Sequence, residues 1–143
     1  MSKQEQLQKV LDALADEVQD VNGAMLASRD GLPIVSTLNP VDASRVAAMA
    51  ATVLSLGARV VETTGLGQFE EAVIQGANGT FIVYDSGSMA TLAVLAKEGA
   101  NLGLIHIEAR RCAEVLAHLM AFFREDAIAD EVVSDGSKLQ VPA

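Results

Sequence analysis

The stretch AAMAATVLSLGARV, residues 47–60, is typical of one helix whose apolar residues cover most of its circumference. Asn39 offers an N-cap, and Pro40 and Asp42 suit the first turn, so we expect the helix to run from Pro40 through Val61. A helix that lies on one sheet buries an apolar arc of little more than about 100°, so this helix needs a second cover. On a helical wheel its polar residues form one stripe about 100° wide, made of Arg45, Thr52, Ser55, Arg59 and Glu62.

The cover that we expect for the second arc is another copy of the chain. Larger residues such as Met49 and Leu56 cluster on one flank of the helix, and small residues fill much of the remaining arc. Small side chains let two helices approach closely, and a two-fold homodimer would pair this helix with itself, next to a free edge of the strand predicted at 68–76. A helix that is fully buried within a monomer is the alternative. The predicted dimer interface comprises Ala47, Ala50, Ala51, Leu54, Gly57, Ala58, Val61, Phe69, Glu71 and Val73.

Length, charge and cysteine content exclude several classes of protein. The 143 residues are enough for one domain, and half of them are apolar. The formal net charge of −9 disfavours nucleic-acid binding and anionic membranes. The single cysteine, Cys112, excludes an internal disulfide framework, and we interpret it as a small core residue. Because the N-terminus lacks a signal-like apolar run and we find no apolar window of about 20 residues, we expect a cytoplasmic protein without membrane insertion.

The order of the predicted elements is α-β-β-α-β-β-β-α, which favours an α+β fold with one five-stranded antiparallel sheet between helices. Turn residues separate the strands, most clearly Asn78-Gly79 between the third and fourth. An acidic tail without fixed structure is expected at the C-terminus, over residues 125–143. The predicted elements are a helix at 3–20, a hairpin at 23–38, the middle helix, strands at 68–76, 80–85 and 89–96, and a helix at 102–123.

No arrangement of side chains in the sequence is typical of an enzyme. His106 and His118 are about three helical turns apart, too far to share a metal ion. The Gly-x-Gly at 65–67 precedes a strand and so lacks the context of a dinucleotide-binding loop. Glu70 and Glu71 point to opposite faces of a strand and do not converge. We therefore expect a non-catalytic protein with no metal and no cofactor.

Three stretches of the chain together resemble the Roadblock / dynein light chain superfamily in its bacterial branch. They are VNGAMLASRDGLPIVS, AAMAATVLSLGARVVETTGLGQFEEAVIQG and GTFIVYDSGSMATLAVLAKEGANLGLIHIEARRCAEVL. The resemblance runs from about residue 4 to 123 and implies a Roadblock-like, or profilin-like, domain at 1–124. It also implies a homodimer in which the middle helices and third strands of two copies join one continuous sheet.

The same resemblance implies a function in signalling. Bacterial relatives are described as regulators or partners of Ras-like small GTPases, some of them GTPase-activating, and eukaryotic relatives are scaffolds. Paired middle helices form the platform for partners in this family, so Arg45, Thr52, Ser55, Arg59 and Glu62 are the expected partner-binding residues. The alternative that remains open is a small-molecule-sensing module without a GTPase partner, which requires an apolar pocket with a few polar groups.

Overall fold

The structure, a computed structural model, describes the backbone of residues 1–134 and the side chains of residues 1–126. Its helices and strands follow the predicted order, and the predicted α+β class is confirmed. The elements are α1 (Lys3–Glu17), β1 (Val21–Ser28), β2 (Pro33–Ser36), α2 (Pro40–Thr64), β3 (Glu71–Gly76), β4 (Gly79–Ser86), β5 (Ala90–Lys97) and α3 (Leu102–Ser134).

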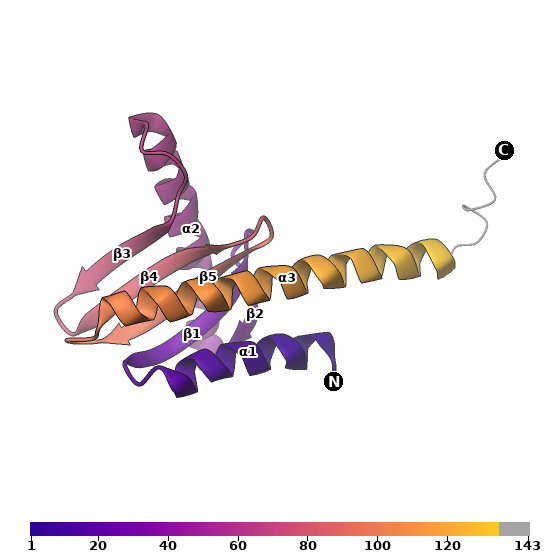
Figure 1. Cartoon of the computed structure of the whole chain (residues 1–143), viewed down its shortest axis with the longest axis horizontal. Coiled ribbons are helices and arrows are strands. Elements are labelled where there is room, and N and C mark those ends of the chain that lie inside the picture. Colours follow the sequence, from indigo (N-terminus) through magenta and orange to yellow (C-terminus); the bar gives the residue numbers. More distant parts are fainter. Residues whose placement is uncertain (135–143) are drawn as a thin grey trace.

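The strands form one antiparallel sheet in the order β2-β1-β5-β4-β3 (Figure 1). Alternate residues of a strand point to opposite faces, so each strand supplies two different layers of the core. Helices α1 and α3 cover one face of the sheet and α2 covers part of the other. The connection from β2 to β3 contains α2, and β3 therefore lies at an edge of the sheet, as the resemblance implied.

The larger core lies between the sheet and the pair of helices α1 and α3. Apolar side chains of α1 meet those of α3 over the central strands, and Leu11, Ile105 and Leu116 are fully buried there. Cys112 belongs to the same core, in agreement with its interpretation as a small core residue. Burial of apolar surface is the main stabilising contribution here, at about 25 cal/mol per Å².

Helix α2 begins at Pro40, as the sequence predicts, and ends at Thr64, three residues beyond the expected Val61. Asn39 caps the N-terminus, because its side chain accepts a hydrogen bond from the backbone N–H of Asp42 at 3.0 Å. Gly65 ends the helix in the left-handed region with φ of 71°, which glycine adopts without a Cβ penalty. Four small or medium side chains of α2 are buried on the sheet, namely Ala43, Ala47, Ala50 and Leu54.

The C-terminal part of the chain differs from its prediction. Helix α3 continues to Ser134 rather than ending at residue 123 (Figure 1), so the expectation of a tail without fixed structure is wrong for residues 125–134. The reason is local: residues 125–134 contain no Gly or Pro, and they include Ala and Glu, which favour helices. The rest of the predicted tail, 135–143, lies outside the described residues.

The apolar character of α2 also exceeds its prediction. By length and composition alone this helix could cross a membrane, since it has 25 residues and contains an 18-residue window with a mean hydropathy of 1.4. That finding corrects the expectation that no sufficiently apolar window exists. Within the fold, however, one face of α2 packs on the sheet through Ala47 and Ala50, and insertion into a bilayer would require the loss of those contacts.

Candidate functional site

The apolar flank of α2 that its own chain leaves uncovered is the flank with the larger side chains. Met49, Leu56 and Val60 are exposed, Leu56 at 63% of its surface, and Val53 beside them is half-buried. On the neighbouring edge strand β3, Ile74 is exposed at 50%. We call the exposed flank of α2 and the exposed apolar residues of β3 the α2–β3 surface, defined by Met49, Leu56, Val60, Val73 and Ile74.

Three of the ten residues of the predicted dimer interface are buried within their own chain, which corrects their assignment to it. Ala47, Ala50 and Leu54 are buried against the sheet of their own chain and offer no surface to a partner. Gly57 faces Phe69 of the same chain, and the carboxylate of Glu71 is turned towards α3. The other seven predicted interface residues are not fully buried, and their contact with a partner stays a prediction: Ala51, Gly57, Ala58, Val61, Phe69, Glu71 and Val73.

An apolar groove of about 570 Å³ runs between α2 and the uncovered part of the sheet. Met49 and Val53 form its wall, and Ile74, Phe81 and Leu95 contribute from three neighbouring strands. Its lining contains a single polar side chain, Thr52, together with the apolar residues Val46 and Ala48. The groove therefore suits an apolar occupant without strong polar anchors.

The two edges of the sheet differ in how they are protected. At the β2 edge, side chains of α1 donate hydrogen bonds to backbone carbonyls: Gln4 to Ile34 and Gln8 to Ser36, each at 3.0 Å. Strand β2 is also short and begins at a proline, Pro33. At the β3 edge, no strand or helix side chain within the described residues forms such bonds. The β3 edge is consequently the one that is open to another strand.

The five predicted partner-binding residues lie exposed along α2. Thr52 donates a hydrogen bond to the carbonyl of Ala48, one turn earlier. Within residues 1–126, neither Arg45 nor Arg59 takes part in an ion pair, whereas three other arginines do. The structure thus brings Arg45, Thr52, Ser55, Arg59 and Glu62 to solvent on one helix, next to the α2–β3 surface.

Side chains from β3, β4 and α3 form a polar cluster that sequence reasoning missed. Tyr84 Oη and His106 Nδ1 lie 2.7 Å apart, within hydrogen-bonding distance. Glu71, whose side chain is 15% exposed, accepts a hydrogen bond from Arg110 at 2.6 Å and lies 3.8 Å from His106. Burial, followed by the negative charge of Glu71, raises the pKa of Tyr84 well above its ordinary value.

The cluster joins the start of β3 to α3 through the contacts of Glu71 with Arg110 and His106. Within the part of the chain that the structure describes, no group of three or more His, Cys, Asp or Glu residues is placed to hold a metal ion. Glu70 and Glu71 do not converge, since Glu70 is exposed while Glu71 turns to Arg110. His118 is exposed and far from His106 along α3.

Comparison with known proteins places the chain among small proteins of bacteria and archaea. It is 36% identical over 100 residues to the uncharacterized protein MJ1340 of Methanocaldococcus jannaschii, covering 69% of this chain and 87% of that protein. A Roadblock/LC7 domain from Streptomyces avermitilis superposes with a TM-score of 0.76 and 26% identity, over 80% of this chain and 97% of that one.

A more distant structure shares the fold. The gliding protein MglB from Thermus thermophilus superposes with a TM-score of 0.73 and 23% identity, over 83% of this chain and 91% of that one. The family model of the Roadblock/LC7 domain matches residues 7–96, which span α1 and all five strands with α2 between them. The resemblance that three stretches of sequence carried is thereby confirmed, and the chain belongs to the Roadblock/LC7 domain family.

Proposed function

We propose that this protein is a homodimeric, non-catalytic adaptor or regulator of a Ras-like small GTPase in the cytoplasm. One observation carries the proposal: the exposed polar stripe of α2 lies on the same helix as the uncovered α2–β3 surface. Covering that surface with a second copy would bring two polar stripes together on one face. The result would be a platform twice the width of a single helix.

The projecting end of α2 supports a second copy as the cover. In Figure 1 the C-terminal part of α2 stands away from the sheet. In a two-fold arrangement, Leu56 and Val60 of one copy would lie in the groove over Phe81 and Leu95 of the other. The two β3 edges would then be close enough to pair and to remove the open edge.

The arginines of the polar stripe support a GTPase as the partner. The chain carries a net charge of −9, yet the polar stripe presents Arg45 and Arg59, which have no ion-pair partner within the described residues. In a dimer four such guanidinium groups would line the platform. Arginine pairs well with carboxylates and phosphates, and it stabilises the charge that develops in phosphoryl transfer when it reaches the nucleotide. The resemblance to regulators of Ras-like GTPases supplies the class of partner.

The decisive experiment measures binding to Ras-like GTPases of the source genome, each loaded with GDP or with a non-hydrolysable GTP analogue. We expect binding that differs between the two nucleotides and that is lost when Arg45 and Arg59 are both changed to Glu. Arg124, an exposed arginine of α3, provides the control for each single site, because Arg124→Glu makes the same substitution at a distant place. Equal binding of the GDP-loaded and GTP-analogue-loaded GTPase would indicate a scaffold rather than a regulator. If none of the GTPases bound, the proposed class of partner would be contradicted.

The groove favours a second candidate function, a module that senses an apolar small molecule. Its volume of about 570 Å³ is within the range of ligand sites, but Thr52 is its one polar lining residue. A ligand and a second copy would compete for the same surface. The candidate is supported if an apolar compound raises the melting temperature and dissociates the dimer, and it is contradicted if added compounds leave both quantities unchanged.

A further inference from the structure

A second set of exposed apolar side chains lies on α3, on the face of the sheet that is opposite α2. Leu104, Ile107, Val115 and Phe122 are exposed at 42% to 61% of their surface. At about 100° per residue they fall on one side of the helix together with Arg111 and His118. We call these six residues the α3 stripe.

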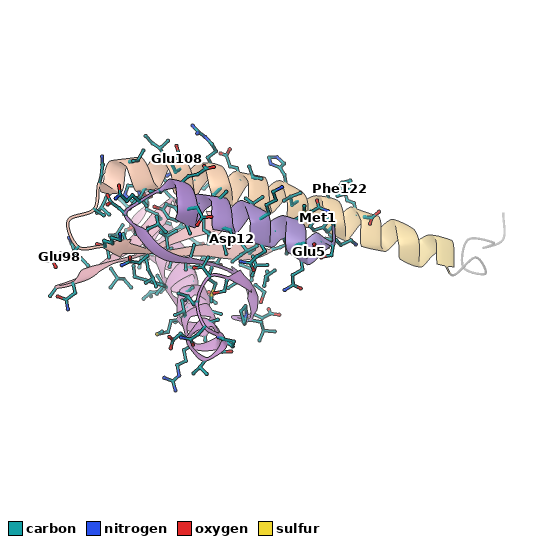
Figure 2. All side chains as sticks on the ribbon, turned by 90° about the horizontal axis from the view of Figure 1, so that it is seen from below. Met1, Glu5, Asp12, Glu98, Glu108 and Phe122 are labelled. Carbon is teal, nitrogen blue, oxygen red and sulfur yellow. The ribbon has the colours of Figure 1, made fainter. Side chains whose placement is uncertain are left out.

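Helix α1 packs beside the α3 stripe without covering it. Contacts near the N-terminus of α1 go to the flank of α3, where Lys3 lies 3.4 Å from Asp126 and over the ring of Phe123. Figure 2 shows α1 alongside α3, and Phe122 on the part of α3 that lies near Met1. In Figure 1, α3 continues beyond α1 and the sheet.

The spacing of the stripe favours antiparallel pairing with an identical helix. With Glu108 in place of its neighbour Ile107, the residues follow one another at alternating steps of four and three, the spacing of a coiled-coil seam: Leu104, Glu108, Arg111, Val115, His118 and Phe122. About a two-fold axis between positions 111 and 115, Leu104 of one copy lies opposite Phe122 of the other. Glu108 then lies opposite His118. A parallel pair would instead place Arg111 against Arg111, and like charges in contact repel.

The charge of α3 also favours a second copy over a strongly basic or acidic partner. Over residues 102–126 the helix carries three arginines and four carboxylates, whereas the chain as a whole has a net charge of −9. The antiparallel register brings Arg111 of one copy close to Glu114 of the other. Both charge and apolar pattern are thus self-complementary on this face.

We propose that two copies of the chain pair antiparallel through their α3 stripes. This interface lies on the opposite side of the sheet from the α2–β3 surface, so it does not depend on the dimer proposed above. A chain with two separate two-fold interfaces assembles into a closed tetramer or an open row, depending on how the two axes meet.

Disulfide cross-linking of the full-length protein tests the pairing and its register. The variant Leu104→Cys/Phe122→Cys places two thiols about 27 Å apart on one helix, too far for a bond within a chain, while the native Cys112 is buried. We expect mild oxidation to yield a covalent dimer from this variant. Leu104→Cys alone and Leu104→Cys/Arg124→Cys are matched controls, since Arg124 is exposed on the other side of α3, and both are expected to stay uncross-linked.

Each outcome is informative. Absence of the covalent dimer, or equal yields from all three variants, would overturn the proposal, and efficient cross-linking of Leu104→Cys alone would overturn the antiparallel register. Sedimentation gives an independent measurement. At several hundred micromolar protein, Phe122→Glu should form an assembly of lower mass than the wild type, with an unchanged circular dichroism spectrum. Cross-linking through α3 remains measurable if the α2–β3 dimer does not form, so the two proposals fail separately.

Discussion

The ring of Phe69 lies so close to Gly57 of α2 that a Cβ at position 57 would stand 2.5 Å from the ring carbon Cε2. Phe69 lies in the segment that joins α2 to β3, and it packs against the cluster that contains Leu54 and Val83. The missing side chain at position 57 therefore allows the chain to return against α2 before β3 begins. Gly57 and Phe69, which the sequence pattern assigned to the dimer interface, thus contact each other within one chain.

Replacing Gly57 by Ala tests this contact through a double-mutant cycle. In a Phe69→Ala background, Gly57→Ala should stabilise the protein by about 1 kcal/mol, because alanine favours the helix over glycine. In the wild-type background the new Cβ displaces the ring, and the gain should be lost or reversed, a coupling of at least about 1 kcal/mol. Urea titrations of the four proteins, all at the same protein concentration, give the free energies of unfolding from which the coupling is calculated. Additive effects of the two substitutions would show that the ring moves away at no cost.

Leu56→Glu should dissociate the proposed dimer and leave the domain folded. Leu56 is exposed in the single chain, so the new carboxylate remains in water in the monomer, but in the dimer it would be buried in the apolar groove. Sedimentation should show a mass of one chain with an unchanged circular dichroism spectrum. Ser55→Glu, the adjacent exposed position on the polar stripe, is the matched control and should remain dimeric. Identical masses for the two variants would argue against this surface as the interface.

Leu54→Glu tests whether Leu54 lies in the core of one chain or at the dimer interface. Leu54 is 3% exposed and packs with Ala50, Val83 and Ala93 in the core of one chain. A carboxylate there has no hydrogen-bond partner, and we expect loss of several kcal/mol and an unfolded or insoluble chain. A soluble, cooperatively folded Leu54→Glu monomer would instead restore Leu54 to the dimer interface.

The fold was predictable because its signals are local. Asn39, Pro40 and Gly65 mark the ends of α2, and Asn78-Gly79 marks a hairpin, so the order of elements follows from short segments. The extension of α3 was missed because the acidic residues after position 124 suggested disorder. Acidic composition does not break a helix when Gly and Pro are absent, and neither occurs between Arg124 and Gly136.

The candidate surface was predictable only in part. Periodicity showed that α2 has two apolar arcs but could not show which arc faces the sheet. Small residues suit a close approach to a sheet as well as to a second helix, and Ala43 and Ala47 pack on Met25 and Ala27 of β1. The Tyr84–His106 contact joins residues 22 positions apart on different elements, and no local pattern indicates it.

The two glutamines of α1 that bond to β2 should limit assembly at that edge of the sheet. Gln4→Ala/Gln8→Ala removes both side-chain donors and leaves the carbonyls of Ile34 and Ser36 unpaired. We expect faster aggregation on agitation, measured by light scattering, because unpaired strand edges recruit further strands. Gln6→Ala is the control, since the side chain of Gln6 donates to the carbonyl of Met1 and, within the described residues, to no carbonyl of β2. Equal aggregation rates would indicate that packing of α1, rather than its glutamines, protects the edge.

Cys112 should react slowly in the folded protein and should make stability depend on alkaline pH. Burial raises the pKa of its thiol to about 12 from an ordinary value of 9.0. At pH 8 the thiolate population is then lower than in the unfolded chain by about 1,000-fold, and labelling with Ellman's reagent should be slower by at least that factor. Rapid labelling of the native protein would show that the thiol is accessible.

The sign of the pH effect follows from the raised pKa of Cys112. Above pH 9 the unfolded thiol loses its proton while the folded thiol keeps it, so the contribution of this residue to stability is complete below pH 9 and declines towards pH 12. Between pH 9 and 10 the decline amounts to about 1 kcal/mol. Cys112→Ala should remove that slope, whereas the contribution of Tyr84, whose pKa is also raised, is common to both proteins and cancels. Urea unfolding of the wild type and of Cys112→Ala at pH 8, 9 and 10 measures the difference, and parallel pH profiles would mean that Cys112 titrates alike in both states.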